Sequence, residues 1–198
     1  MPESLSAPRV HATVASPLGE LTLVREGARV TGLYFAQHWY RPPPSSLGPR
    51  VGHGFEVVMS QLAEYFAGQR QEFDLASLLA GTDEQLAAWR LVARIPYGET
   101  TTYGALAREL GSGIDARDAG KLIGRNPLCI LVPCHRVIGA SGHLTGYAGG
   151  VARKRALLEL ERALPVAAHQ LSLAFGEAAD IRDELRPRLA GRSGRRAG

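Results

Sequence analysis

The stretch NPLCILVPCHRV, residues 126–137, places a thiol and an imidazole side by side at the end of an apolar run. The run from Leu128 to Val132 is short and continuous, which predicts a buried strand. Neighbouring residues of a strand point to opposite faces, so Cys134 and His135 can act together only if the chain turns there. Pro133 before the pair and a glycine-rich stretch after it favour such a turn.

The chemistry of the pair leaves two interpretations open. A thiol becomes a nucleophile as thiolate, and a nearby histidine that accepts its proton is a common way to form one. A free cysteine is otherwise most often a small buried hydrophobe. The chain has only two cysteines, and Cys129 is expected to be such a packing residue. Because both lie in one predicted strand, a disulfide between them is disfavoured. Without a second Cys/His pair at ligand spacing, we expect no metal site.

Composition limits the class of protein. The 198 residues suffice for one large domain or two small ones, and 45% are hydrophobic, as in an ordinary globular protein. No stretch approaches the length of a transmembrane helix, and the N-terminus has no signal-peptide pattern, so we expect a cytoplasmic protein without membrane contact. The net charge of +4 is mild, and part of it comes from a C-terminal tail rich in Gly, Arg and Ser.

The first eighty residues have the pattern of a small α+β unit. Polar and apolar residues alternate over 10–15, 21–25 and 30–37, which predicts a three-stranded antiparallel meander. Residues 53–67 have apolar residues at helical spacing and predict a helix that covers this sheet. Three prolines in 41–46 predict a loop with neither ladder nor helix. We find no chemistry in this part and interpret residues 1–80 as a support domain.

From residue 81 the pattern becomes helical. We expect helices from Asp83, as N-cap, to Arg94, from Thr101 or Thr102 to Leu110, from Asp115 to Gly124, and from Val151 to about Leu164. Two short helices joined by a glycine-containing turn are typical of a helix-turn-helix, although this shape alone predicts DNA binding only weakly. The fold is therefore α+β: a small N-terminal antiparallel sheet with a helix, then a mainly helical domain over 81–165. Residues 166–198 form an extension with a further helix at 177–189 and the basic tail.

Over this second part the sequence resembles the O6-alkylguanine-DNA alkyltransferases. The resemblance is carried, in collinear order, by Gly81-Thr82, Ile95 to Thr100, Thr102 to Gly104, Arg117, Asn126-Pro127, Pro133 to Val137, Gly146 to Gly150 and Leu157 to Glu161. It implies a DNA-repair protein that irreversibly transfers the alkyl group of O6-alkylguanine, with O4-alkylthymine as a further candidate substrate, to one cysteine. It implies no metal or organic cofactor, double-stranded DNA as partner, and a monomer without a protein partner.

The resemblance assigns five residues to the reaction. Cys134 corresponds to the alkyl acceptor, and His135 to the residue that removes its proton through a bridging water. Glu161 corresponds to the carboxylate that orients the imidazole, with Glu159 as the competing carboxylate of the same helix. Asn126 corresponds to the hinge between the helix-turn-helix and the active-site segment. Tyr103 corresponds to the phenol that hydrogen-bonds the extruded base and helps to protonate the leaving guanine.

The resemblance also implies a DNA-binding set. Arg117 corresponds to the residue that fills the gap left by the flipped nucleotide, and Gly120 fits a helix that approaches DNA closely. Tyr147 is expected to wall the base pocket, and the backbone of Ala148 to contact the guanine. The remaining two members of the set are basic: Lys121 and Arg136.

Three positions depart from the family pattern. Glu84 stands where relatives usually carry Phe, so its carboxylate must be exposed or paired. Asp118 lies beside Arg117, close to Asp115, where acidic groups repel phosphate. Alternatively, the two aspartates form a helix cap and its partner. Lys121 is the third departure: it replaces a usually small residue, and its positive charge would offset the acidic groups. Two rival functions remain: a non-catalytic damaged-DNA-binding protein on the same scaffold, which needs no thiol, and a Cys-His hydrolase, which would turn over.

Overall fold

The computed structural model describes residues 7–164, so the expected helix at 177–189 and the basic tail lie outside the described residues. Strands β1 (Arg9–Val14), β2 (Leu21–Glu26) and β3 (Arg29–Phe35) form one antiparallel sheet in the order β1-β2-β3, which confirms the predicted meander. Leu23 pairs with Leu33, and both lie in the main hydrophobic core. Val24 and Tyr34 pack instead with Leu47 on the opposite face.

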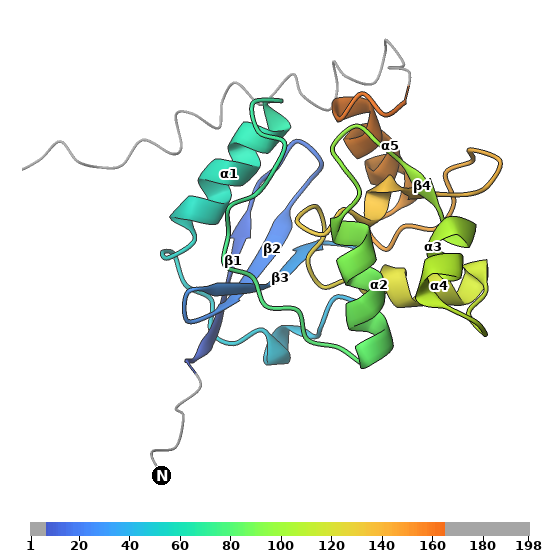
Figure 1. The fold of residues 1–198 in the computed structure, drawn as a ribbon. Coiled ribbons are helices and arrows are strands. Elements are labelled where there is room, and N and C mark those ends of the chain that lie inside the picture. Colours follow the sequence, from blue (N-terminus) through green and yellow to red (C-terminus); the bar gives the residue numbers. More distant parts are fainter. Residues whose placement is uncertain (1–6, 165–198) are drawn as a thin grey trace, which may run out of the picture.

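Helix α1 (Glu56–Phe66) packs beside this sheet, as predicted (Figure 1). Its buried face carries Val58, Leu62 and Tyr65, one helical turn apart. The chain leaves the helix through Gly68, whose φ of +70° favours glycine. The proline-rich segment differs from prediction in one detail, because Pro44–Ser46 forms a single 3-10 turn, η1. Proline fits the first position of a helical turn, where no N–H donor is needed.

Helices α2 (Asp83–Ala93), α3 (Tyr103–Leu110) and α4 (Ala116–Gly124) follow the predicted spans closely. The N-cap of α2 is Thr82 and not Asp83: Thr82 and Gln85 bond each other's backbone N–H in a capping box. Thr102 caps α3 and Asp115 caps α4. The indole N–H of Trp89 in α2 donates to the carbonyl of Leu122, which fixes the helix-turn-helix of α3 and α4 on α2.

The active-site segment is a turn and not the predicted strand. Only Leu128 makes a β-bridge, with Leu33 of β3, and Ile130 has a φ of +70°, which ends any strand there. The 3-10 turn η2 (Cys134–Arg136) follows and leads into β5 (Val137–Ile138), which pairs in parallel with β4 (Thr101–Thr102). This short sheet holds the start of α3 beside the segment that carries Cys134. Helix α5 (Val151–Leu160) then ends before its predicted limit.

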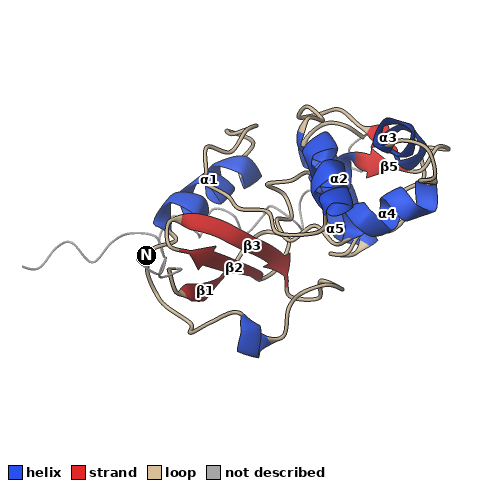
Figure 2. Cartoon of the chain, turned by 60° about the horizontal axis from the view of Figure 1, so that its bottom comes forward, coloured by secondary structure: helices blue, strands red, loops and turns tan. Residues whose placement is uncertain are grey.

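The two halves of the chain share one hydrophobic core. Helices α2 to α5 form a group beside the sheet and α1 (Figure 2). The N–H of Leu33 donates to Pro127 O at 2.8 Å, and the N–H of Cys129 donates to Leu33 O at 3.1 Å. The sheet therefore anchors the active-site segment directly. Between residues 7 and 164, no helix has the length and hydropathy needed to cross a membrane.

Candidate active site

Cys134 lies at the start of the 3-10 turn η2, so the turn expected at Pro133 is present. Its side chain is buried, and Asn126 Nδ2 lies 3.2 Å from the sulfur. The pKa of Cys134 is lowered, first by the neighbouring Cys129 thiol, then by the Asn126 amide and the positive charge of Lys154, which together outweigh the effect of burial. These groups favour a thiolate inside the protein.

His135 and Glu161 form a fully buried pair. His135 Nε2 lies 2.9 Å from Glu161 Oε1, and neither side chain is exposed. Burial lowers the pKa of His135, so the neutral imidazole is favoured at neutral pH. With Nε2 donating to the carboxylate, Nδ1 carries the free lone pair, and this nitrogen has no hydrogen-bond partner among the described residues. His135 thus has the tautomer and the free nitrogen of a general base.

Glu161, the C-cap residue of α5, accepts three further hydrogen bonds. Arg136 Nε donates to Oε2 at 2.8 Å and Arg136 Nη2 to Oε1 at 2.9 Å, while the Tyr65 hydroxyl donates to Oε1 at 2.7 Å. Burial raises the pKa of Glu161, but the hydrogen bonds from His135 and Arg136 outweigh it and bring the pKa to about 2. The carboxylate that faces His135 is therefore ionised and fixed.

Two sequence-based expectations change at this carboxylate. Arg136, which was expected at the DNA, is buried, and its Nη1 also donates to Ile95 O at 2.6 Å. Its guanidinium therefore forms its hydrogen bonds inside the protein. Tyr65 comes from α1, in the part of the chain where we found no chemistry. Its hydroxyl reaches a carboxylate 96 residues away, a contact that no local pattern reveals.

Glu159, the competing carboxylate, lies on another side of α5. Its Oε1 is 3.8 Å from Arg155 and has no hydrogen-bond partner among the described residues. A salt bridge of that length to a half-exposed arginine contributes little to stability. The geometry favours Glu161 as the partner of His135.

Asn126 joins α4 to the active-site segment. Its Nδ2 donates to Val132 O at 2.8 Å as well as approaching the Cys134 sulfur, and its Oδ1 accepts from Leu128 N at 2.9 Å. The side chain is fully buried. One amide thus satisfies both ends of the turn that presents the thiol, which fits the hinge position expected from the sequence.

Tyr103, the first residue of α3, contacts the loop before α5. Its hydroxyl donates to Gly146 O at 3.1 Å and accepts from Lys154 Nζ at 3.2 Å. Burial, and then the charge on Cys134, raise the pKa of Tyr103 to about 12. The phenol therefore keeps its proton at neutral pH.

Lys154 is a second site residue that sequence reasoning missed. It is fully buried, its Nζ donates to Thr145 O at 2.9 Å, and burial lowers its pKa to about 8. Its position contained a signal, since Lys154 precedes Leu157, Leu158 and Glu161 by three, four and seven residues, which is one helix face. Arg153, the preceding residue in the same basic run of residues 151–155, donates to Leu18 O at 2.7 Å and Gly149 O at 2.8 Å within the protein.

The loop before α5 supplies the expected pocket residues. Tyr147 is buried, with its ring edge toward Phe35 at 6.3 Å between centroids and its hydroxyl without a hydrogen-bond partner among the described residues. Ala148 is buried too, and its carbonyl accepts from Trp39 N at 3.0 Å. That bond ties the loop to the segment that follows the sheet.

The residues expected at DNA on α4 have different surroundings. Arg117 is exposed, and Lys121 Nζ forms an exposed ion pair with Asp118 at 2.8 Å. A side chain at Gly120 would meet Tyr103 at an ordinary contact distance of 3.6 Å, so packing within the protein does not require glycine there. Asp115 Oδ1 accepts from Arg117 N and Asp118 N, so Asp115 alone caps the helix. Glu84 is exposed on α2, one of the two environments expected for it.

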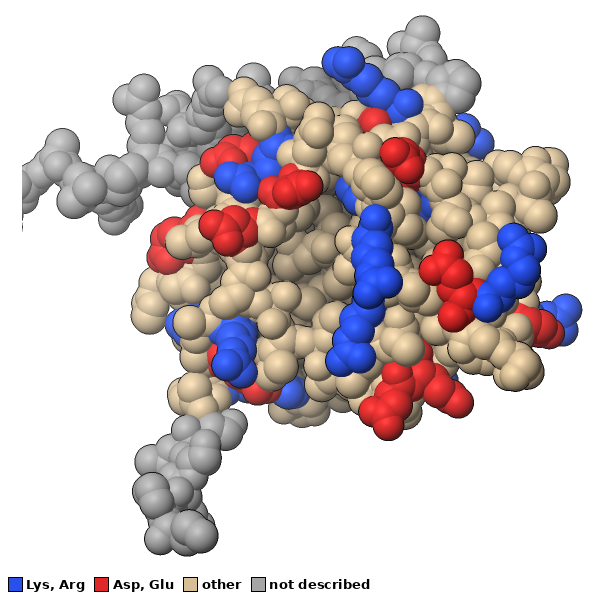
Figure 3. Space-filling model, viewed as in Figure 1, with Lys and Arg blue, Asp and Glu red and all other residues tan. Residues whose placement is uncertain are grey.

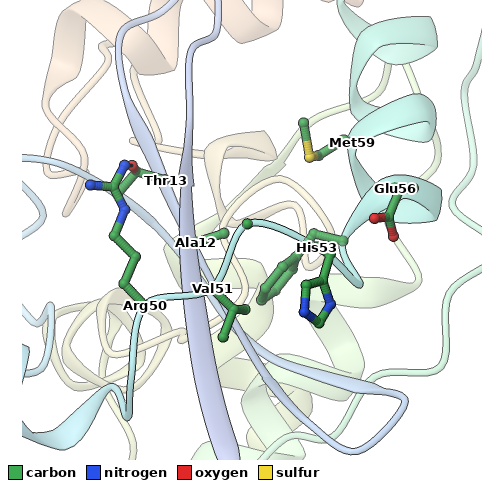
Figure 4. A pocket seen from close by; sticks show the side chains of 9 residues that line it. Ala12, Thr13, Arg50, Val51, His53, Glu56 and Met59 are labelled. Atoms are coloured by element: carbon green, nitrogen blue, oxygen red, sulfur yellow. Dashed lines mark hydrogen bonds between the residues drawn. The ribbon is translucent and has the colours of Figure 1, made fainter. Parts of the chain in front are cut away.

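Among the described residues, charged side chains are spread over the surface, and one cavity lies apart from Cys134. One face carries Lys and Arg interspersed with Asp and Glu (Figure 3). A cavity of about 440 Å³ opens between β1 and the start of α1, with Arg50, His53 and Glu56 around it (Figure 4). None of the residues predicted for the site lines this cavity.

Comparison with known proteins matches nearly all of the described chain. Residues 83–163 match the family model described as 6-O-methylguanine DNA methyltransferase, DNA binding domain, and residues 10–79 match its ribonuclease-like domain. The methylated-DNA–protein-cysteine methyltransferase of Mycobacterium tuberculosis H37Rv is 48% identical over 152 residues, 77% of this chain and 92% of that protein. The constitutive enzyme of Bacillus subtilis 168 is 39% identical over 156 residues, 77% of this chain and 94% of that protein.

The solved structures agree. Mycobacterium tuberculosis OGT, crystallised in complex with DNA, superposes with a TM-score of 0.71 at 46% identity and covers 78% of this chain and 93% of its own. The resemblance noted in the sequence, the α+β fold and the paired family matches lead to one conclusion. The chain belongs to the methylated-DNA–protein-cysteine methyltransferase family.

Proposed function

We propose that this protein repairs O6-alkylguanine in DNA by moving the alkyl group to the sulfur of Cys134. The observation that carries the proposal is the buried thiol with a lowered pKa in the turn that also carries the His135–Glu161 pair. A soft thiolate suits attack on an alkyl carbon whose leaving group is a heteroaromatic base. The neighbouring helix-turn-helix and the DNA-bound relative support DNA as the carrier of that carbon.

Activation of the thiol follows from the buried pair. The proton of Cys134 moves to His135 Nδ1, through the bridging water that the family resemblance implies. The imidazolium that forms is stabilised by Glu161, which Arg136 and Tyr65 keep ionised and in place. Cys134 then acts as the nucleophile, and its sulfur is already stabilised as a thiolate by the Asn126 amide.

Displacement breaks the bond between the alkyl carbon and O6 and forms the bond between that carbon and sulfur. The electron pair of the broken bond stays on the guanine, which needs a proton. Tyr103 supplies that proton, and the ammonium of Lys154 at 3.2 Å stabilises the phenolate left behind. The same ammonium holds the 145–146 carbonyls, so the wall of the pocket and the proton donor are positioned together.

The substrate must leave the base stack to reach the buried sulfur. We assign to Arg117, which is exposed near the start of α4, the role of entering the stack and filling the gap. A flat guanidinium can stack on bases, which an ammonium cannot. Tyr147 and the Ala148 backbone then line the pocket that receives the flipped base.

A thioether is stable toward water, so each molecule should react once. The test is the count of alkyl groups transferred per protein from a duplex with a single O6-methylguanine, under excess DNA. One equivalent supports the proposal. Multiple equivalents would indicate a Cys-His hydrolase, and binding without transfer would indicate a non-catalytic damaged-DNA-binding protein.

A further inference from the structure

The second free cysteine, Cys129, lies in the same buried turn as Cys134. Val132 N donates to Leu128 O at 2.8 Å and Leu131 N donates to Cys129 O at 2.8 Å, so the chain folds back on itself between the two cysteines. The Asn126 amide bonds Val132 O and lies 3.2 Å from Cys134 Sγ, which closes the turn around a single side chain. Residues 129 and 134 thus lie on a compact turn and not along an extended strand.

The two cysteines lie close together inside this turn. Asn126 Nδ2 lies 3.4 Å from Leu128 O, on the peptide that leads into Cys129, and 3.2 Å from Cys134 Sγ. Cys129 is completely buried and Cys134 is 6% exposed. The sequence argument against a disulfide assumed a strand that held the two side chains apart. That strand is absent, so the argument no longer applies.

We propose that Cys129 is a resolving thiol, which captures Cys134 in an intramolecular disulfide when a peroxide has oxidised it. The disulfide would protect the nucleophile from irreversible oxidation and return it on reduction by a thiol. Its benefit for repair rests on the proposed function, because a protein that reacts once loses its whole capacity with one sulfur. The disulfide itself requires only the two cysteines and the turn.

The chemistry takes two steps. The Cys134 thiolate attacks one oxygen of the peroxide, the O–O bond breaks, and the sulfur becomes a sulfenic acid while the released hydroxide or alkoxide takes up a proton. Cys129 sulfur then attacks the Cys134 sulfur, an S–S bond forms, the S–O bond breaks, and the hydroxyl leaves as water with the Cys129 proton. In total, two thiols lose two hydrogens and the peroxide is reduced.

The surroundings assign the two roles. The neighbouring Cys129 thiol lowers the pKa of Cys134, which makes Cys134 the thiol that meets the oxidant as thiolate. The Cys134 sulfur and burial raise the pKa of Cys129 well above its usual range, so Cys129 keeps its proton until it condenses. A disulfide that closes so short a segment carries strain, and strained disulfides are the ones most readily reduced.

The experiment uses the full chain and hydrogen peroxide. Residues 126–136 lie between Arg125 and Arg136, so trypsin releases both cysteines in one peptide. After peroxide treatment, denaturation and blocking of free thiols with iodoacetamide, the wild-type peptide should be unblocked and lighter by two hydrogens. Dithiothreitol should restore both thiols. In Cys129→Ser, Cys134 should instead gain two or three oxygens that dithiothreitol does not remove.

Two results would contradict the proposed disulfide. Overoxidation of the wild-type peptide to the same extent as in Cys129→Ser, or a disulfide between two molecules on a non-reducing gel, would overturn the proposal. If Cys129→Ser does not fold, Cys129→Ala provides the same comparison without a buried hydroxyl. Because the readout is the mass of a peptide, the disulfide can form in a protein that fails to accept an alkyl group. Such a result would refute the proposed function and leave this inference standing.

Discussion

Replacement of Glu161 by glutamine should remove a large, pH-dependent part of the stability. The pKa of this carboxyl falls from 4.5 to about 2 on folding, despite its burial, through hydrogen bonds from His135 and Arg136. A lowering of that size corresponds to about 3 kcal/mol, and no discount for solvent applies because the side chain has no exposed surface. Glutamine keeps the shape, loses the charge, and leaves the Arg136 guanidinium buried without its counter-ion.

The sign of the pH dependence follows from the lowered pKa. Above pH 4.5 the carboxylate is ionised in both states and the full contribution is present. As the pH falls from 4.5 toward about 2, the unfolded chain binds a proton that the folded protein resists, and the contribution disappears. Glu161→Gln has no carboxyl group to titrate at this position, so its stability does not change for this reason. The difference in stability between the two proteins should therefore shrink over this pH window.

The assay is urea unfolding of wild type and Glu161→Gln at several pH values between neutrality and strong acid. At neutral pH the loss of about 3 kcal/mol should also lower Tm by roughly 6–12 °C. Glu159→Gln is the matched control on the same helix, since its carboxylate lies 3.8 Å from its nearest cation. A difference between wild type and Glu161→Gln that stays constant with pH would refute this account of the carboxylate.

Three further predictions concern the base pocket and the DNA-binding helix. Arg117→Ala should slow repair of duplex DNA by roughly ten-fold or more, since flipping costs a few kcal/mol. Its reaction with free O6-benzylguanine should change little. Equal losses of rate with both substrates would place Arg117 in the chemistry or in folding. Lys154→Met should slow alkyl transfer severalfold and move the iodoacetamide reactivity of Cys134 to higher pH, because a buried cation near the thiolate is lost. An unchanged pH profile would limit the role of Lys154 to binding the carbonyls of residues 145–146. Asp118→Ala should change stability by less than about 1 kcal/mol, because the pair of Asp118 with Lys121 is exposed. It should strengthen the affinity for duplex DNA, and added salt should reduce this gain. A weaker affinity together with a lower Tm would show that Asp118 has a structural role.

The sequence predicted the elements whose patterns are local. Alternation predicted the three strands, and helix starts near Thr102 and Asp115 with a glycine-containing turn between the helices predicted the helix-turn-helix. The run from Leu128 to Val132 misled, because a short apolar run is compatible with either a buried strand or a buried turn. The deciding feature is the Asn126 side chain, which satisfies the backbone groups that a strand would have paired with a neighbour.

The site was predictable where residues correspond to a known motif and unpredictable where contacts cross the fold. His135 and Glu161 form a buried pair, and Cys134 lies in the same turn as His135, while the roles that the resemblance assigns to them stay a prediction. Arg136 looked like a phosphate ligand because its partner, Glu161, lies 25 residues away in sequence. Tyr65 looked like an ordinary core residue for the same reason. Lys154 was not recognised because it lies among other basic residues, although it shares a helix face with the buried Leu157 and Leu158.

The measurement that tests the central claim most directly is the intact mass of the protein after incubation with duplex DNA containing O6-methylguanine. Wild type and Cys129→Ala should each gain the mass of one methyl group in place of one hydrogen, and the gain should stop at one. Cys134→Ala should gain nothing. A methyl group found on Cys129, or continued demethylation of the DNA with the protein mass unchanged, would contradict the account.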